Sequence, residues 1–168
     1  MTKSLALAIT QIYPHLTPFV DFRVFDDGSG QQILNWTASV PQPTQQQLDS
    51  AWLIVARNLK IDELRASYQN AISGTFASSA LGVAHTYLAV QAQENYNSEV
   101  HRYLIDPTYT STLVDTVDAG LLSHTKTQFF QVFMDGHDFV ISQRVKLDNY
   151  ITQVSTATET QLSTINWA

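Results

Sequence analysis

Two N-terminal segments of the chain concentrate large apolar residues around a short polar turn. Residues 19–25 and 32–38 are rich in Phe, Val, Ile and Trp, and the sequence Asp-Asp-Gly-Ser-Gly occupies positions 26–30. This arrangement is typical of a β-hairpin. The first strand carries large apolar groups on both faces, so we expect burial on both sides or a partner that covers one of them. The mostly apolar segment 5–10 predicts one further strand.

The hydrophobic pattern then changes to a helical period. Pro41 and Pro43 end the second strand of the hairpin, and Thr44 with Gln47 three residues later forms a capping box. A helix over 44–72 would be about 43 Å long at 1.5 Å per residue. Its apolar residues recur at spacings of three, four and five, which keeps them on one face: Leu48, Trp52, Val55, Leu59, Leu64, Tyr68 and Ile72.

The middle of the chain predicts a connection, a short helix and a second hairpin. Gly74 is expected to end the long helix, and the small residues that dominate 71–87 predict a helix stop rather than a binding site. Apolar spacing over 91–104 predicts a short helix, which the sequence Asp-Pro at 106–107 ends. Weak alternation over 111–123, with Asp-Ala-Gly in its middle, predicts the hairpin.

The C-terminal third predicts two helices. Thr125 with Gln128 forms a second capping box, and Thr156 with Glu159 opens a short last helix that should end near Trp167. Along the longer of the two helices, apolar residues recur every seventh position, as in a coiled-coil seam: Phe133, Val140, Leu147 and Val154.

Together these elements predict an α+β fold. The expected order is an N-terminal β-hairpin, a long amphipathic helix, a small central β-hairpin with a short helix, and a C-terminal helix pair. We expect two regions, with residues 1–43 forming an attachment or interface region and residues 44–168 forming a helical α+β domain.

Composition narrows the classes of function. The chain of 168 residues has a formal net charge of −6, which argues against a nucleic-acid partner, because nucleic-acid binders need a basic stripe. It has no cysteine and no apolar run near the roughly 18 residues of a membrane span. Charged residues make up only 14%, which favours a surface that packs against other proteins. We expect that the protein neither binds a membrane nor acts on a small-molecule substrate.

Motifs that carry chemistry are scattered or explained by local structure. The five histidines form neither an HxH nor an HExxH pair, the spacings that place two imidazoles on one metal. Asp135 and Asp138 in the sequence DGHD share a helix face, and a solvated surface explains them better than an ion site. His85 and His124 are expected to form local hydrogen bonds. No nucleophile, base and oxyanion hole assemble, so we expect neither an enzyme nor a cofactor.

Several segments resemble a family of small bacteriophage tail proteins of largely unknown function. The resemblance covers residues 65–167 and rests on YQNAISGTFASSALGVAHTY, LLSHTKTQFFQVFMDGHDF and VSTATETQLSTINW. Upstream, NWTASVPQPTQQQLDSAW is similar to a proline- and glutamine-rich segment common in such proteins. The chain departs from the family pattern after Tyr87, where it reads LAVQAQ.

The resemblance implies a structural role in a phage tail, beside tail fibre or baseplate proteins. The chain would then reside in the virion, and in the host cytoplasm during assembly. An alternative is a tail-fibre assembly chaperone that is absent from the mature particle, and another is a glycan-degrading accessory enzyme. The long helices predict packing against copies of the same chain, for instance as a trimer, or against a fibre. The candidate interface residues are Phe22, Val24, Trp36, Trp52, Phe129, Phe133, Val140 and Leu147.

Overall fold

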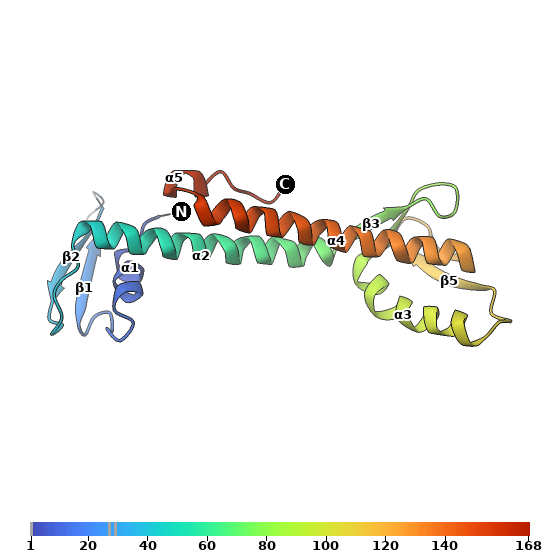
Figure 1. Ribbon diagram of the computed structural model, residues 1–168, viewed down its shortest axis with the longest axis horizontal. Helices are drawn as coiled ribbons and strands as arrows, with labels where there is room; N and C mark the ends of the chain where they lie inside the picture. The colour runs from blue at the N-terminus through green and yellow to red at the C-terminus, as the bar shows by residue number, and fades with distance from the viewer. Residues whose placement is uncertain (1, 27, 29) are drawn as a thin grey trace. The chain divides into compact units, whose positions relative to one another are not determined.

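The computed structural model describes residues 2–26, 28 and 30–168, without the side chains of residues 90–95. In this part of the chain, helices alternate with three two-stranded antiparallel sheets, which is the predicted α+β class (Figure 1). The elements are α1 (Leu5–Ile12), β1 (Phe22–Asp26), β2 (Gln31–Trp36), α2 (Gln45–Ile72), β3 (Thr75–Ser78), β4 (His85–Leu88), α3 (Ala89–Ile105), β5 (Ser111–Thr116), β6 (Gly120–Thr125), α4 (Lys126–Thr156) and α5 (Glu159–Leu162).

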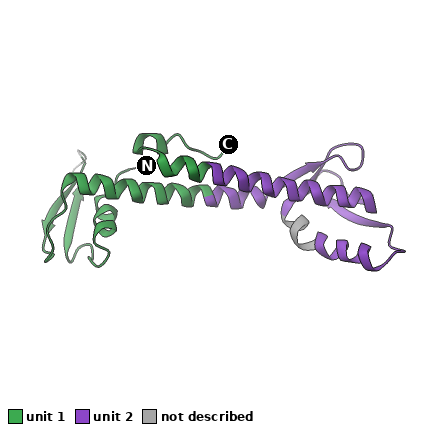
Figure 2. Ribbon diagram, viewed as in Figure 1, with its two compact units in different colours: residues 1–64, 150–168 green, residues 65–149 purple. Residues whose placement is uncertain are grey.

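The chain divides into two compact units, and their limits differ from the predicted regions 1–43 and 44–168. Unit 1 comprises residues 1–64 and 150–168, and unit 2 comprises residues 65–149 (Figure 2). Contacts far apart in sequence hold the C-terminal segment within unit 1. The Arg57 guanidinium donates two hydrogen bonds to the carbonyl of Ala157, at 3.1 and 2.7 Å. The attachment or interface role expected for residues 1–43 remains a prediction.

The N-terminal segment is a helix, so the predicted strand over 5–10 is wrong. Leu5, Ala8 and Ile9 of α1 are buried, which is the spacing of one helix face. Ser4 caps the helix, because its hydroxyl accepts a hydrogen bond from the N–H of Leu7. A short apolar run fits a strand and a buried helix equally well, and tertiary packing against β1 and β2 decides between them.

The predicted N-terminal hairpin is present, with shorter strands than the sequence suggested. β1 and β2 pair from Phe22 opposite Trp36 to Asp26 opposite Gln31. The aromatic rings of that first pair stack at a centroid distance of 6.0 Å. Residues 27 and 29 of the predicted turn lie outside the described residues.

Helix α2 begins as predicted and buries a somewhat different face. The Thr44 hydroxyl accepts from the N–H of Gln47 at 3.3 Å, and the Gln47 side chain accepts from the N–H of Thr44 at 2.9 Å. Leu59, which the pattern placed inward, is exposed. Most of the buried positions instead recur every fourth residue; the complete set is Leu48, Ala51, Trp52, Ala56, Lys60 and Leu64.

Unit 2 contains a hairpin that the sequence did not predict. β3 and β4 lie within the segment interpreted as a helix stop, and they pair from Thr75 opposite Leu88 to Ser78 opposite His85. Phe76 of β3 lies opposite Tyr87 of β4, and their stacked rings join the core of the unit. Strands of only four residues carry too little alternation to be recognised from the pattern alone.

The remaining elements agree with the sequence except at the last helix. The central hairpin β5–β6, the short helix α3 and the capped start of α4 at Thr125 are present. Thr156, however, is the last residue of α4 and does not open the final helix. Thr158 and Gln161 form that capping box instead, and α5 ends at Leu162 rather than near Trp167.

Candidate interaction surface

The structure places half of the candidate interface residues in the interior of the chain. Phe22, Trp52, Phe129 and Leu147 are buried, so in this fold their side chains contribute to packing within one chain. Hydrophobic periodicity identifies inward-facing positions and cannot tell a core from an interface. An interface role remains a prediction for the four half-buried residues, which are Val24, Trp36, Phe133 and Val140.

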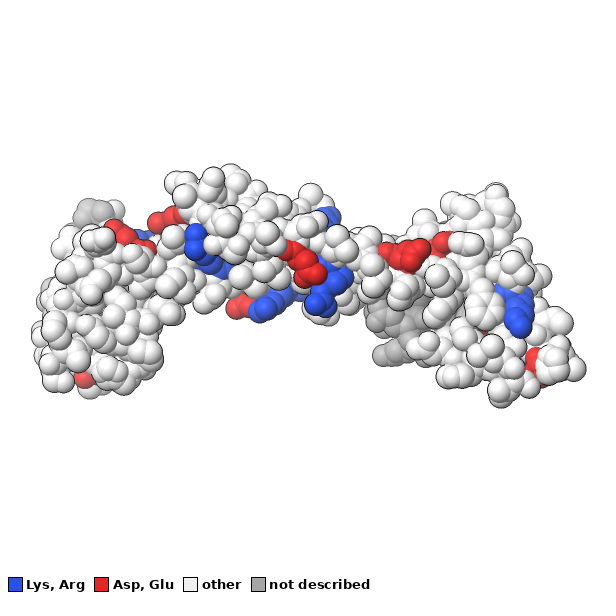
Figure 3. All heavy atoms as spheres, viewed as in Figure 1, with Lys and Arg blue, Asp and Glu red and all other residues white. Residues whose placement is uncertain are grey.

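Among the described residues of unit 1, the most exposed apolar side chains lie on and beside the N-terminal hairpin. Phe19 is 77% exposed, Val20 71%, Leu34 68% and Phe25 55%. On the face drawn in Figure 3, the region of this hairpin carries few charged side chains. We call these four residues together with Arg23 the hairpin surface. Exposed apolar groups that gather in one place mark interaction sites more often than isolated ones do.

A network of hydrogen bonds holds Phe19 and Val20 at the surface. The N–H of Phe19 donates to the carbonyl of Phe22 at 2.8 Å, and the Thr37 hydroxyl donates to the carbonyl of Val20 at 2.9 Å. The loop is closed by Asp21, whose carboxylate accepts from the N–H of Thr17 at 2.7 Å. Phe19 has a backbone φ of +69°, a conformation that costs a bulky residue free energy. The loop therefore fixes an exposed aromatic side chain in a strained position.

A β-bulge gives Leu34 its exposure. Arg23 pairs with Asn35 while Val24 pairs with Ile33, so Leu34 is the extra residue on β2. Bulges redirect a side chain relative to the regular alternation of a strand. The inward positions of β1 are Phe22 and Val24, and the alternating side chains therefore point to the opposite, exposed face.

A small pocket of about 220 Å³ opens between the hairpin surface and the start of the chain. Phe19 and Arg23 belong to its lining, which also includes Phe22, Val24, Pro18, Gln31, Ser4 and Ala6. Arg23 is exposed, and it forms no hydrogen bond or ion pair with the described residues. The sequence pattern identified Phe22 and Val24 as candidate interface residues. It did not identify Phe19 or Arg23, because neither a loop held by hydrogen bonds nor an arginine without a described partner produces a periodic pattern.

A second cleft in unit 1, of about 610 Å³, surrounds the buried Lys60. The Lys60 ammonium donates to Glu63 Oε1 at 2.9 Å and to Asn166 Oδ1 at 3.3 Å. On the same cleft, the Trp52 indole N–H donates to Glu159 Oε1 at 2.6 Å. These contacts join α2 to the C-terminal segment. They satisfy the buried Lys60 ammonium, so its burial needs no functional explanation.

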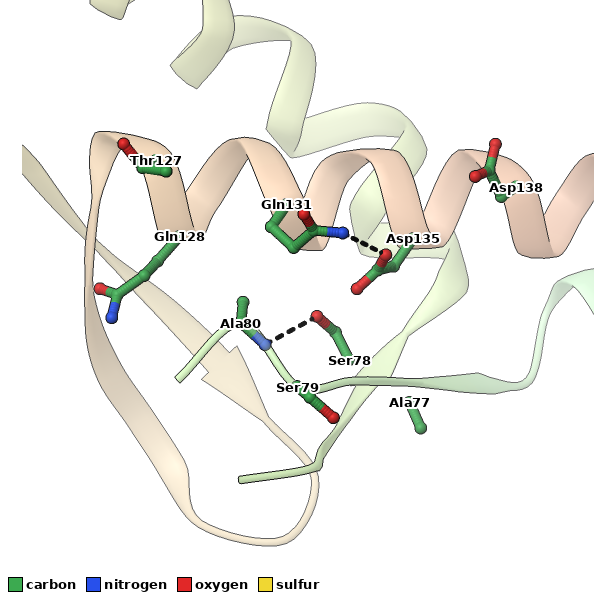
Figure 4. Close-up of a pocket in the computed structure, with 9 residues that line it drawn as sticks. All are labelled: Ala77, Ser78, Ser79, Ala80, Thr127, Gln128, Gln131, Asp135 and Asp138. Carbon is green, nitrogen blue, oxygen red and sulfur yellow. Dashed lines mark hydrogen bonds between the residues drawn. The ribbon is translucent and has the colours of Figure 1, made fainter. Parts of the chain in front are cut away.

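In unit 2 a polar groove lies between β3 and α4 (Figure 4). It includes Asp135 and Asp138 of the DGHD sequence, and the Gln131 side chain donates to Asp135 Oδ1 at 2.7 Å. Figure 4 shows the two carboxylates pointing in different directions, so they do not converge on one point. Among the described residues, His, Asp and Glu side chains form no group of three that could hold a metal ion.

Two histidines of unit 2 form hydrogen bonds, but only the bond of His124 to Leu122 is local, as predicted for both; His85 and the other bond of His124 reach residues more than 30 positions away in sequence. His124 is fully buried, and its Nδ1–H donates to the carbonyl of Leu122 while its Nε2 accepts from the hydroxyl of Tyr87, each at 2.9 Å. Burial lowers the pKa of His124 from its ordinary value of 6.5. His85 pairs with Asp118 at 2.9 Å, and the N–H of Thr86 and His85 together lower the pKa of the Asp118 carboxyl.

Comparison with known proteins found a match to one phage-associated protein family. No curated protein and no solved structure matches the chain. None of the described helices combines the length and the apolar character that crossing a membrane requires. The predicted likeness to a phage protein family of largely unknown function is confirmed, but over residues that precede the segment 65–167 on which the resemblance was based. Residues 5–58, which include the whole hairpin surface, match the sequence model of the XkdW protein family, a phage-associated family of largely unknown function.

Proposed function

We propose that this protein is a structural component of a phage tail, associated with the baseplate or a tail fibre, and that it acts by packing against other proteins without catalysis. The proposal rests on the fact that two features lie in the same part of the chain. The residues that match a phage-associated family are also those that build the hairpin surface. In this proposal the protein resides in the virion tail, after assembly in the host cytoplasm.

The energetics of the hairpin surface support a role in protein–protein contact. Burial of apolar surface against a partner is favourable by about 25 cal/mol per Å². Phe19 and Phe25 each expose more than half of their surface, and aromatic residues dominate the energetics of interfaces. Because the loop around Phe19 is held by its own hydrogen bonds, little conformational entropy would be lost when a partner binds.

The polar groups of unit 2 support a role without catalysis. The hydroxyl of Tyr87 and the imidazole of His124 are hydrogen-bonded to each other, and both residues are fully buried, so a substrate cannot reach them in this fold. The carboxylates of the groove in Figure 4 diverge, whereas acid–base chemistry needs groups that converge on one reacting atom.

Quantitative mass spectrometry of gradient-purified particles tests the proposal. A structural component should be present in a fixed ratio to the baseplate and fibre proteins, and that ratio should survive a second gradient. A protein that is abundant in the infected cell and absent from the particle would contradict the proposal. That result would favour the assembly chaperone, which uses the same kind of surface only until the fibre is complete.

A further inference from the structure

We infer that the hairpin surface binds an apolar, acidic polypeptide segment of another tail protein. One apolar side chain of that segment enters the pocket beside Phe19, and a carboxylate close to it pairs with Arg23. This inference rests on the proposed function, because that function makes the occupant a protein. It adds the chemistry of the contact and the residues that recognise it.

The size of the pocket sets the size of the group that enters it. Pockets for small molecules have volumes of roughly 300–1,000 Å³, and this pocket has about 220 Å³. It is large enough for a single apolar side chain. Phe22 is buried and Val24 is half-buried in its lining, and Ala6 and Pro18 add further apolar surface. A lining of this kind favours an aliphatic or aromatic side chain.

Arg23 supplies the charge that selects the segment. It is the only Lys or Arg between Lys3 and Arg57. Among the described acidic residues, the two that flank Arg23 most closely in sequence bind backbone N–H groups. Asp21 accepts from the N–H of Thr17, and Asp26 accepts from the N–H of Gly28. Arg23 is one of the residues that line the pocket, and its exposed side chain pairs with no described residue. A carboxylate of the bound segment can therefore bind its guanidinium through two parallel hydrogen bonds.

The position of Phe19 indicates that the pocket serves binding rather than folding. A phenylalanine at φ +69° is strained, and its side chain gains little from burial, because it is 77% exposed. Strain that brings no packing within the chain is typical of binding sites. Here it places an aromatic ring beside the pocket, where the ring can cover an inserted side chain.

A second copy of the chain fits this surface less well than a different protein does. Contact between two copies through the same patch is isologous, so each residue near the two-fold axis meets its own counterpart. Such a contact would bring two Arg23 guanidinium groups together, neither of which pairs with a described residue of its own chain, and like charges placed opposite each other are destabilising. A segment with a carboxylate neutralises the positive charge of Arg23, whereas a second copy would add another positive charge beside it.

Photo-crosslinking at residue resolution tests the inference. A photoreactive phenylalanine analogue replaces Val20, which is exposed next to Phe19. The variant is the only version of this protein in the cells that produce the phage. We expect the crosslink to map to a tail protein, at an apolar residue within about three positions of an Asp or Glu. A crosslink to a basic segment, to a second copy of the chain, or to no protein would overturn the inference.

Charge reversal provides the matched control. Arg23→Glu should lower the yield of the mapped crosslink at least tenfold, and Arg144→Glu should leave it unchanged, because Arg144 is an exposed arginine of α4. An unchanged yield with Arg23→Glu contradicts the inference. Far-UV circular dichroism checks that the variant folds. If it does not, Arg23→Gln removes the charge with less change of shape and should also lower the yield.

The two proposals can fail separately. If the crosslink maps to an acidic apolar segment but the protein is absent from purified particles, the structural role fails and the binding chemistry stands. If the protein is present in particles but Arg23→Glu changes neither its amount nor its crosslink, the binding chemistry fails and the structural role stands.

Discussion

The hydroxyl of Tyr87 should stabilise unit 2 through its hydrogen bond to His124. In Tyr87→Phe the ring remains, and it still stacks on Phe76, but Nε2 of His124 loses its donor in the interior. An unsatisfied buried polar group costs about 1–3 kcal/mol. Both residues are fully buried, so water cannot easily replace the lost donor. We therefore expect the free energy of unfolding to fall by about 1–3 kcal/mol.

Tyr103→Phe provides a matched control in the same core. Tyr103 is also buried, but its hydroxyl has no hydrogen-bond partner among the described groups. Its removal deletes a buried polar atom without leaving a partner unsatisfied, so the free energy of unfolding should stay the same or rise. The two variants delete the same atom type from the same kind of site, and they differ in the partner alone.

Thermal and urea unfolding followed by circular dichroism measure both variants, and hydrogen exchange assigns the change to unit 2. For a unit of this size, each kcal/mol lowers the melting temperature by about 4–8 °C. Equal destabilisation by both variants would refute the reasoning, because the loss would then come from the hydroxyl itself and not from its bond to His124.

Three further predictions concern single residues. Because burial lowers the pKa of His124, the unfolded chain binds a proton at this residue before the folded chain does as pH falls. The contribution of His124 to the free energy of unfolding should therefore be complete above about pH 6.5 and decline below it, by at most about 1.4 kcal/mol per pH unit. In urea unfolding across pH 5–8, His124→Gln should remove that part of the pH dependence. Phe19→Gly should leave stability unchanged or raise it by up to about 1 kcal/mol, because the relief of strain exceeds the added backbone entropy; a loss above 1 kcal/mol in urea unfolding would show that the ring stabilises the fold. Thr44→Ala should cost about 1 kcal/mol through the lost cap of α2, and an unchanged urea midpoint would contradict this.

Local signals in the sequence predicted the long helices well. The capping pairs at Thr44 and Thr125 act within four residues, so their hydrogen bonds follow from the sequence alone. The error at Thr156 has the same origin, because Thr158 with Gln161 offers an equivalent pair two residues later. Which pair forms depends on where α4 stops, and the contact of Ala157 with Arg57 lies a hundred residues away in sequence.

Features that depend on distant contacts could not be predicted. The segment 5–10 is apolar enough for a strand, and only its packing against β1 and β2 makes it α1. The sequence identified Phe22 as an interface residue from its apolar character, and the fold turns it inward. Arg23 and Leu34 gave no signal, because the freedom of Arg23 depends on where Asp21 and Asp26 find their donors, and the exposure of Leu34 depends on a bulge.

The incorporation of a hairpin-surface variant into particles tests the central claim most directly. A phage that lacks the gene is complemented with the wild-type chain, with Phe25→Asp/Leu34→Asp, or with the control Leu121→Asp, which changes an exposed leucine of β6 in unit 2. The amount of each chain per purified particle is then measured by mass spectrometry, after circular dichroism has shown that each chain folds. We predict wild-type amounts for the control and loss of the double variant. A double variant that is retained at the wild-type ratio would contradict the account.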